Sequence, residues 1–375
     1  MPDPDLDILI LGGGCAGLSL ACRLSGGRSR VGIVETRSRY IEDRTWCHWH
    51  TASHPFDGCI RKRWDRWLVS RHGAITIRGA TDMPYVAISS SAFYETALRC
   101  CEDGKNVHLW LGTTATDTTG HAGAWAVETS RGRLTTRTLI DARPPRIPPN
   151  YGQFFRGVEI HTDRARFDPT TVGLMHFRPP HAGGIDFVYV LPFASDRALV
   201  EVTRFGSARP SSEWLKTWLA EECDRLSDGA TTAVLREEAG ALPMQAGYGV
   251  AKGPSQGYAR IGLGGGAARP STGYAFQRIQ RMSDRLAAQI QSSSDTPWLD
   301  PRLDGAITRV LDRLFLRVIQ SAPERGPEFF HALFANAPPE RLERFLAGSV
   351  AAADRLSVIA SLPPAFFLRS ALRSS

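Results

Sequence analysis

The glycines near the start of the chain have the spacing of a dinucleotide-binding turn. A strand-length apolar run leads into Gly12, Gly14 and Gly17 in a G-x-G-x-x-G pattern, a helix-compatible run follows, and a second apolar strand ends at Glu35. In such a unit the first glycine allows the tight turn, the second lets the backbone approach a pyrophosphate, and the third packs helix against strand. The helix N-terminus faces the phosphates, and the acid binds a ribose hydroxyl. The pattern predicts a dinucleotide site that includes Gly12, Gly13, Gly14, Gly17 and Glu35.

The acid at the end of the second strand limits which dinucleotide fits. Glu35 favours a free 2′-hydroxyl, as in FAD or NAD, over a 2′-phosphate. A glycine motif at the start of a long chain is typical of FAD proteins, in which the adenine half is bound first. A plain glycine-rich linker would explain neither the apolar runs on both sides of the motif nor the acid.

A second glycine cluster follows a later strand. Residues 259–263 read as a strand, Gly264, Gly265 and Gly266 overlap its end, and a long helix is predicted from about 275 to 292. This arrangement predicts a second turn that contacts phosphate or flavin and returns the chain to the other half of the dinucleotide. A glycine-rich turn that only packs tightly against the helix is the alternative.

The elements around these turns indicate a mixed α/β fold. We expect a Rossmann-type FAD-binding domain formed by residues 1–150 and 240–295, which is discontinuous in the sequence. Runs with strand-like alternation predict a second, mostly antiparallel β-rich substrate lobe from residues 60–90 and 150–240. Residues 296–375 read as a helical C-terminal region.

Composition and charge describe an ordinary folded protein. The chain has 375 residues, of which 42% are hydrophobic and 22% charged, and its net charge is +7 with a pI near 9.2. The arginines are dispersed and no long Lys/Arg block occurs, which argues against nucleic-acid binding. The positive charge is compatible with attraction to anionic lipid headgroups.

The cysteines and the N-terminus indicate the compartment. Seven cysteines are odd in number and contain no C-x-x-C pair, so we expect a reducing compartment, no disulfide framework and no metal site. The first residues include Asp3, Asp5 and Asp7 instead of a positive region, which argues against a signal peptide. No apolar run approaches the ~18 residues of a membrane span. We expect a cytoplasmic protein, either soluble or peripheral on the inner face of the membrane.

Several colinear segments of the chain resemble the bacterial lycopene cyclase family, flavoproteins that form the β-ionone rings of carotenoids. Together they cover most of the chain, and the run at 270–280 is long enough to be specific. The matching segments are 43–47, 153–160, 187–193, 198–203, 236–238, 242–244, 270–280 and 312–316.

The resemblance implies a fold related to FAD monooxygenases and geranylgeranyl reductases. It also implies a reaction without net redox change, in which FAD is active in its reduced form and NAD(P)H is the reductant. Protonation of a polyene end group gives a carbocation, the ring closes, and loss of a proton gives the product. The matched motifs place Arg44 and Tyr274 among the cofactor-binding residues.

The family's acidic motif falls on Glu201 in this chain. A proton donor to an alkene must be a carboxylic acid that is neutral near pH 7, and burial in an apolar pocket raises a carboxyl pKa in that direction. Val200 and Val202 flank Glu201 in the sequence, although strand alternation puts both valines on the opposite face. A Glu201 that faces solvent, or that pairs with Arg204, is the alternative.

Two further residues are candidate acids or bases. The family strand before the catalytic Glu usually reads Met-Asp-Phe, and here it contains His176, which titrates near neutrality. Glu238 is a candidate second acid beside Glu237, although adjacent carboxylates are more often one solvated residue and one arginine partner. Another departure is His48, where the family has Phe after Trp-Cys.

Aromatic residues of the matched motifs are candidates to stabilise a carbocation through their π faces. These are Trp46, Trp49 and Tyr274, and core packing is the alternative for each. The leading prediction is an intramolecular lyase or isomerase that converts lycopene to a carotenoid with β-ionone rings. A flavin monooxygenase, dehydrogenase or reductase on another apolar polyene, or a degenerate carotenoid-binding scaffold, is the alternative.

The C-terminal third combines large apolar residues with arginines. The apolar segments are 329–334, 345–346 and 365–368, and the arginines include Arg341 and Arg344. This pairing predicts interfacial helices on a peripheral membrane surface, where an apolar polyene substrate would be reached. Amphipathic helices that pack on the core are the alternative.

Overall fold

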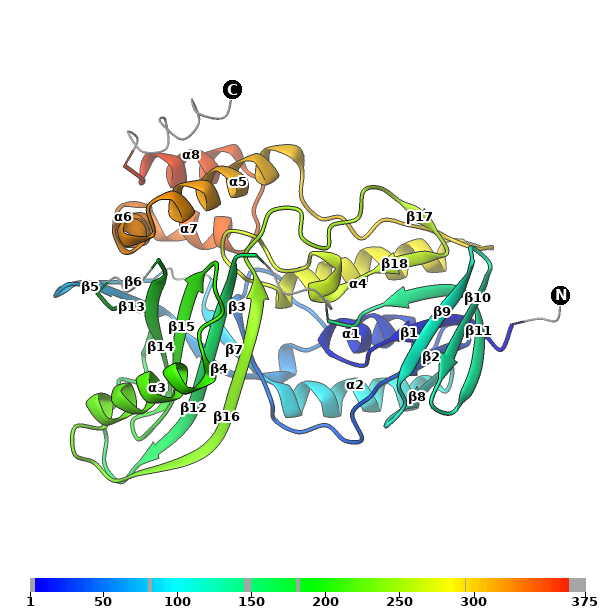
Figure 1. The fold of residues 1–375 in the computed structure, drawn as a ribbon, viewed down its shortest axis with the longest axis horizontal. Helices are drawn as coiled ribbons and strands as arrows, with labels where there is room; N and C mark the ends of the chain where they lie inside the picture. The colour runs from blue at the N-terminus through cyan, green and yellow to red at the C-terminus, as the bar shows by residue number, and fades with distance from the viewer. Residues whose placement is uncertain (1–3, 80–82, 145–149, 180–182, 294, 364–375) are drawn as a thin grey trace.

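Parallel strands from distant parts of the chain form the first sheet, at the right of Figure 1. The computed structural model describes residues 4–79, 83–144, 150–179, 183–293 and 295–363. The strand order is β8-β2-β1-β11-β10-β9, and β18 pairs with β11 off this path. The pairs β10–β11 and β9–β10 are antiparallel, and the other pairs are parallel. The strands are β1 (Leu6–Leu11), β2 (Val31–Val34), β8 (Val107–Trp110), β9 (Ala115–His121), β10 (Ala124–Thr129), β11 (Gly132–Asp141) and β18 (Tyr258–Arg260).

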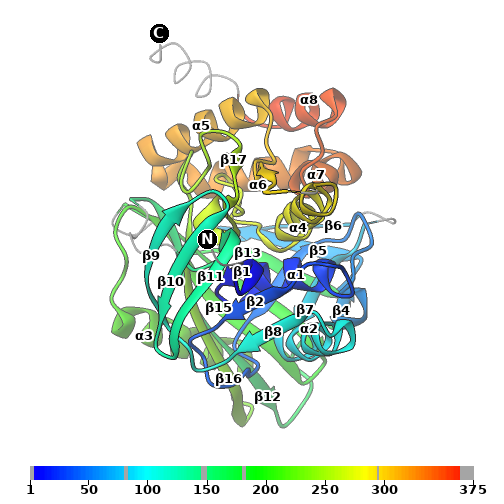
Figure 2. The ribbon, with the colours of Figure 1, turned by 90° about the vertical axis from the view of Figure 1, so that its right-hand side faces the viewer.

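The apolar run of β1 supplies both faces of this sheet. Ile8 and Ile10 pack against helices, and Leu9 and Leu11 pack on the opposite face with residues of β10 and β11. Figure 2 shows α1 and α2 on one side and β9 and β10 on the other. The helices of this layer are α1 (Cys15–Leu24), α2 (Ser90–Gly104) and α4 (Phe276–Gln291).

The second sheet is antiparallel except where β13 pairs with β5. Its order is β16-β12-β15-β14-β13-β5-β6, and α3 (Ser212–Ser227) covers one face through Leu215, Trp218 and Leu219. The strands are β5 (Arg66–Arg71), β6 (Ala74–Arg78), β12 (Gly152–Thr162), β13 (Thr171–Phe177), β14 (Ile185–Ala194), β15 (Arg197–Gly206) and β16 (Thr232–Pro243).

Smaller elements join these two sheets and cover the second one. A sheet of β3 (Thr45–Trp49), β7 (Tyr85–Ser89) and β4 (Ile60–Trp64) lies between them, and β17 (Ser255–Gln256) pairs with β19 (Trp298–Leu299). The C-terminal helices lie over the face of the second sheet that α3 leaves free (Figure 1). They are α5 (Ala306–Ser321), α6 (Gly326–Asn336), α7 (Pro339–Leu346) and α8 (Ala352–Ala360).

The observed architecture confirms the predicted fold class, a mixed α/β protein with a Rossmann-type sheet, an antiparallel second sheet and C-terminal helices. The domain boundaries stay predictions. Within the described residues, no helix combines the length and the apolar character that crossing a membrane requires.

The large apolar residues of α6 and α7 lie inside the protein. Phe329, Phe330, Phe334 and Phe345 are buried in the core between these helices and the second sheet. This corrects the expectation that segments 329–334 and 345–346 present their aromatic rings to a membrane, because those rings are used for core packing. The predicted segment 365–368 lies outside the described residues.

A buried ion pair ties the loop before α4 to the C-terminal helices. The Arg269 side chain donates to Asp312 Oδ1 at 3.3 Å and to the Phe345 carbonyl at 2.6 Å, and Ser271 Oγ donates to Asp312 at 2.7 Å. Both charged side chains are almost fully buried. Removing one partner leaves the other charge buried without compensation.

We expect Asp312→Asn to lower the free energy of unfolding by about 3–5 kcal/mol, because it strands the Arg269 charge in the core. Denaturant unfolding measures the change. Glu128→Gln is the control, since it removes the exposed Arg133–Glu128 pair and should cost less than about 1 kcal/mol. Equal effects of the two substitutions would contradict this account.

Candidate functional site

The N-terminal glycines form a tight turn that leaves one position open. Gly12 has a φ of +99°, and a Cβ on Gly17 would lie 2.0 Å from the Gly12 carbonyl oxygen, so both positions require glycine. Gly14 is the N-cap of α1 and offers the helix no side-chain cap. The nearest atom to a Cβ on Gly14 would be Arg37 Nη2, at 3.8 Å. Uncapped N–H groups beside open space suit an anionic group such as a pyrophosphate.

Glu35 and its neighbours hold the turn in place. Glu35 Oε2 accepts a hydrogen bond from the Gly13 N–H at 2.7 Å, and Oε1 accepts one from the Arg37 N–H at 2.8 Å. The Arg37 guanidinium also donates to the Gly13 carbonyl and stacks over the rings of Tyr40 and Tyr94. The sequence analysis assigned no role to Arg37. The feature that could have indicated one is a cation two residues after the acid that follows β2.

The second glycine cluster packs against the first. Gly262 begins the short turn after β18. A Cβ on Gly262 would lie 2.9 Å from the Ala16 Cβ in α1. A Cβ on Gly264 would lie 2.7 Å from the Arg143 carbonyl, and one on Gly265 would lie 2.2 Å from the Arg260 carbonyl. The ends of β1, β11 and β18 therefore meet at one edge of the sheet, where dinucleotides bind in folds of this class.

The turn at Gly264, Gly265 and Gly266 needs its glycines for close packing, and Gly266 also has a φ of +77°. The predicted flavin contact of this turn stays a prediction. Arg44 lies nearer the second sheet, where its Nη1 donates to the Ala239 carbonyl at 2.9 Å.

Two carboxylates face each other across a strand that has no side chain between them. Glu201 on β15 and Glu238 on β16 are both paired with Gly157 of the intervening strand β12. Residues in register on neighbouring strands share one face of a sheet. A Cβ at position 157 would lie only 3.1 Å from the Glu201 Cβ. The glycine therefore gives the two carboxyl groups the space to approach each other.

Arg236 binds the second carboxylate, Glu238, and also Glu159. Its Nη1 donates to Glu238 Oε2 at 2.6 Å and its Nε donates to Glu159 Oε2 at 2.8 Å, while Thr45 Oγ1 also donates to Glu238 at 3.0 Å. Glu159 is fully buried, and Arg61 and Arg197 donate to it as well. Burial raises the pKa of Glu159, but the arginine hydrogen bonds outweigh it and hold that pKa at about 2.

Glu201 has the opposite electrostatic environment. Burial raises its pKa well above the usual range, and the negative charge of Glu238 together with a hydrogen bond between the two carboxyl groups raises it further. Thr203 Oγ1 donates to Glu201 Oε1 at 3.1 Å, which opposes the shift without cancelling it. The pair therefore consists of Glu201, whose raised pKa favours the protonated form, and the arginine-bound Glu238.

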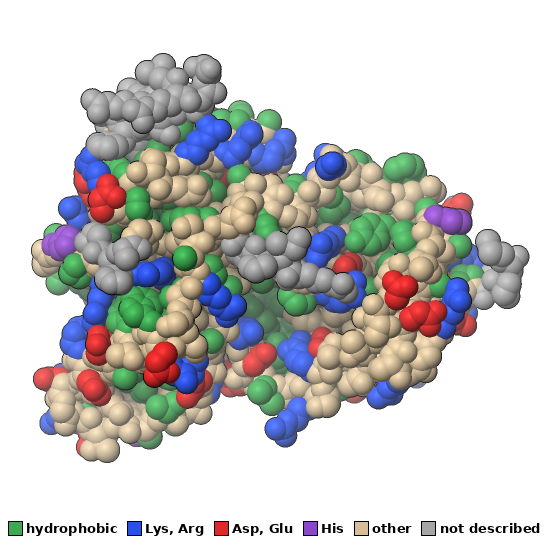
Figure 3. Space-filling view, viewed as in Figure 1, with side chains coloured by type: hydrophobic (Ala, Val, Ile, Leu, Met, Phe, Trp, Pro, Cys, Tyr) green, Lys and Arg blue, Asp and Glu red, His purple; other side chains and the backbone are tan. Residues whose placement is uncertain are grey.

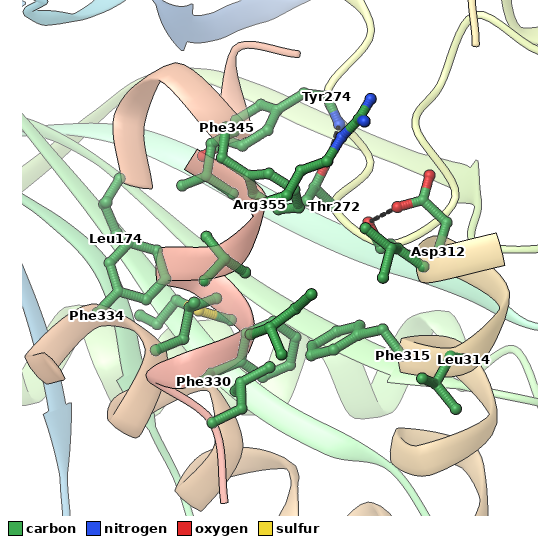
Figure 4. Close-up of a pocket in the computed structure, with 18 of the residues that line it drawn as sticks. Leu174, Thr272, Tyr274, Asp312, Leu314, Phe315, Phe330, Phe334, Phe345 and Arg355 are labelled. Atoms are coloured by element: carbon green, nitrogen blue, oxygen red, sulfur yellow. Dashed lines mark hydrogen bonds between the residues drawn. The ribbon is translucent and has the colours of Figure 1, made fainter. Parts of the chain in front are cut away.

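An apolar cavity begins beside this pair. Tyr189 is paired with Glu201 on β14 and lines the cavity together with Tyr274. The cavity lies between the second sheet and the C-terminal helices, and the empty space in it and at its open mouth is about 1090 Å³. Figure 4 shows Phe315, Phe330 and other apolar side chains around it. This lining suits a hydrocarbon, and Tyr189 connects it to Glu201 on the adjoining strand.

Two groups of predicted residues lie elsewhere. His176 is paired with Val188, and its pKa is lowered to about 4 by burial and by Arg225 of α3, so it faces α3 on the opposite side of the sheet from Glu201. The structure does not bring it to the carboxyl pair. Trp46 packs against Phe93 and Phe276 under the first sheet, which fits the core-packing alternative.

Sequence reasoning missed other residues around the pair. Cys47 lies close enough that, after burial, the charges of Glu238 and Glu201 raise its pKa. Gly157, Thr203 and Arg236 stood inside or beside matched motifs but carried no assigned role. What brings these residues to the pair is the register of β12, β15 and β16, which a single sequence does not reveal.

Comparisons with known proteins agree with this architecture. The lycopene cyclase protein family model matches residues 7–372. A lycopene beta-cyclase from Paracoccus sp. is 27% identical over 96% of this chain and 94% of its own length, and one from Pantoea ananas is 26% identical over 96% of both.

Solved flavoprotein structures share the fold. A geranylgeranyl bacteriochlorophyll reductase-like protein from Thermoplasma acidophilum has a TM-score of 0.63 at 12% identity and covers 97% of this chain and 98% of its own. A flavoprotein/dehydrogenase from Cytophaga hutchinsonii has the same TM-score and identity over 99% and 100% of the two chains. With a family model that spans almost the whole sequence, this chain belongs to the lycopene cyclase family.

Proposed function

We propose that this protein is an FAD-dependent, non-redox cyclase of the end group of a linear polyene, with lycopene as the leading substrate and a β-ionone ring as the product. The observation that carries the proposal is the raised pKa of Glu201, which is paired across the sheet with Tyr189, a residue that lines the apolar cavity. The family relationship supports the same reaction. Such a cyclisation is an isomerisation, so product and substrate have equal mass.

The residues present fit an FAD cofactor. The open side of Gly14 and the uncapped N-terminus of α1 would hold the pyrophosphate, with Arg37 beside it. The second glycine turn, which packs on α1, would lie along the rest of the cofactor. When bound, FAD reduced by NAD(P)H would support the cyclisation without net redox change.

The carboxyl pair provides the proton chemistry. Glu201 donates its proton to the CH carbon of the terminal double bond, which leaves a tertiary cation on the dimethyl carbon. The next double bond attacks this cation and closes the ring, which moves the positive charge to a ring carbon. The Glu201 carboxylate then accepts a proton from a carbon beside that cation, so that the double bond of the product forms and the acid is restored. Arg236 and Thr45 hold Glu238 beside Glu201, and the charge of Glu238 raises the pKa of Glu201, which favours its protonated form between turnovers. The π faces of Tyr189 and Tyr274 along the cavity can stabilise the cation.

A redox or oxygenase reaction on the same kind of substrate is the competing function. Solved neighbours include a flavin-dependent monooxygenase in complex with FAD and substrate, with a TM-score of 0.60 at 13% identity. Such a reaction changes the substrate mass and does not need a neutral carboxylic acid in the cavity. Mass spectrometry of pigments from a lycopene-accumulating host separates the two functions.

Two helices that line the cavity, α5 and α8, also expose apolar side chains to solvent. These include Ile307 at 60% and Leu356 at 65%. The two helices are adjacent, because Arg355 of α8 donates to Thr308 of α5. Figure 3 shows arginine and hydrophobic side chains side by side over the C-terminal helices. We propose that this face rests on anionic lipid and takes the polyene from the bilayer.

For the cofactor, we expect Gly14→Val to abolish FAD binding, because the side chain would fill the open space beside the α1 N-terminus while meeting no described protein atom within 3.4 Å at Cβ. Flavin absorbance after gel filtration measures occupancy. Gly253→Val is the control, since nothing lies within 4 Å of a Cβ at that position. Full flavin occupancy in the Gly14 variant would remove this turn from the cofactor site.

For the acid, we expect Glu201→Gln to slow cyclisation by at least ~100-fold, because an amide keeps the shape of the side chain but does not donate a carboxylic proton. Flavin content should stay unchanged. Pigment chromatography from a lycopene-accumulating host measures the product, and turnover near the wild-type rate would exclude Glu201 as the donor.

The pH dependence supplies the matched control. Glu201 must be protonated, so wild-type activity should fall as the pH rises through its raised pKa. Glu238→Gln removes the charge that raises this pKa, and the alkaline limb of the profile should therefore move to lower pH. A profile that does not move would show that the two carboxyl groups are not coupled.

For the membrane face, we expect Ile307→Ser with Leu356→Ser to reduce flotation of the protein with anionic liposomes. Val234→Ser with Leu235→Ser is the control, because these residues are exposed on β16 at 59% and 47% and should have no effect. Equal flotation of both variants, or flotation that does not depend on anionic lipid, would contradict the proposed contact.

A further inference from the structure

Three histidines gather on the face of β3 that points away from the carboxyl pair. His48 lies in β3, His50 follows its end, and His54 lies in the next loop. One ring nitrogen from each lies within 4.8 Å of the nitrogens of the other two. Phe276 of α4 stacks against His48, with ring centroids 5.2 Å apart.

These rings have ligand atoms without protein partners. His48 is 2% exposed, and neither of its ring nitrogens has a hydrogen-bond partner. His50 Nδ1 and His54 Nε2 are also buried and unpartnered. A buried polar atom without a partner carries a desolvation cost, and four such atoms around one point are unusual for a packed core.

The geometry points to a binding site for a divalent transition-metal ion such as Zn²⁺, with His48, His50 and His54 as ligands. Imidazole nitrogen is the ligand type that such ions prefer over Mg²⁺ or Ca²⁺. Tetrahedral Zn–N bonds of 2.0–2.1 Å place ligand nitrogens about 3.4 Å apart. The ligand nitrogens lie within 4.8 Å of one another in this structure. Metal binding would bring them closer by up to about 1.5 Å, which rotation of the side chains can provide.

Asp57 supplies the supporting carboxylate that metal-bound histidines usually have. Its Oδ1 lies 3.2 Å from His54 Nδ1 and 3.8 Å from His50 Nε2. His54 Nδ1 accepts a hydrogen bond from the Phe56 N–H in the metal-free structure. Metal binding at His54 Nε2 would move the ring proton to Nδ1, which would then donate to Asp57.

Charged side chains of both signs lie near the cluster. Asp57 is the acidic neighbour, and Arg63 and Arg23 are positive charges that repel a cation. A bound ion therefore depends on strong bonds to nitrogen and on Asp57, which excludes weakly held alkaline-earth ions.

The role that follows is structural. An ion at this point would tie β3 to the loop that contains His54 and to the packing around Phe276. The opposite face of β3 carries Thr45, which donates to Glu238. The metal would thus brace the strand that helps to fix the acid pair, without touching the reacting groups.

The test uses the full-length chain without a histidine tag, stripped with chelator and then dialysed against ZnCl₂. We expect one zinc per chain by elemental analysis, a higher melting temperature with zinc, and a tetrahedral ligand-field spectrum with Co²⁺. Asp57→Asn should weaken zinc binding about 10–100-fold.

His48→Phe is the decisive variant, because a phenyl ring can keep the stacking on Phe276 but has no ligand atom. It should fold and lose both the bound zinc and the zinc-dependent rise in melting temperature. His121→Gln is the control, since that histidine is exposed and outside the cluster. No zinc in the wild type, or equal zinc in the His48 variant, would overturn the proposal. His54→Gln gives an independent check, and retained zinc there would overturn it as well.

Discussion

The site depends on the Arg236 guanidinium, which binds two carboxylates at once. It binds the fully buried Glu159 on one side and Glu238 on the other. A buried arginine needs this compensation, and Arg61 and Arg197 complete the network at Glu159. The charge of Glu238, which Arg236 holds in place, raises the pKa of Glu201. The protonation of the proposed acid on β15 therefore depends on a residue of β16, on the far side of β12.

The backbone register provides the geometry for this electrostatic arrangement. Glu238, Gly157, Glu201 and Tyr189 lie in one row across β16, β12, β15 and β14. A side chain in place of the glycine would separate the carboxyl groups, and a shift of one residue in any strand would turn its side chain to the α3 face. The apolar contacts of α3 with Val200 and Val202 oppose such a shift, since both valines must stay on that face.

The fold was predictable to the extent that local patterns determine it. The apolar run of β1, the glycine spacing and Glu35 define the first sheet and its turn, and the structure contains them at the expected places. His176 was a candidate by motif position, but the strand alternation and a bulge in β13 direct it to α3. Arg236 and Gly157 were not singled out, because their role depends on pairing between strands far apart in the sequence. The three histidines are close together in the sequence, and they were missed because the search for metal ligands relied on cysteine spacing.

The strand β3 connects these separate features. Its alternation directs Thr45 and Cys47 to the carboxyl pair and Trp46 and His48 to the packing beneath the first sheet. Movement of β3 would change the hydrogen bond to Glu238 and the contact with Phe276 together. Both sides of the strand are thus mechanically coupled, and its length of five residues leaves little freedom for one side to adjust alone. The proposed acid pair and the proposed metal site therefore lie on opposite faces of one short strand, so that a change on one face is felt on the other.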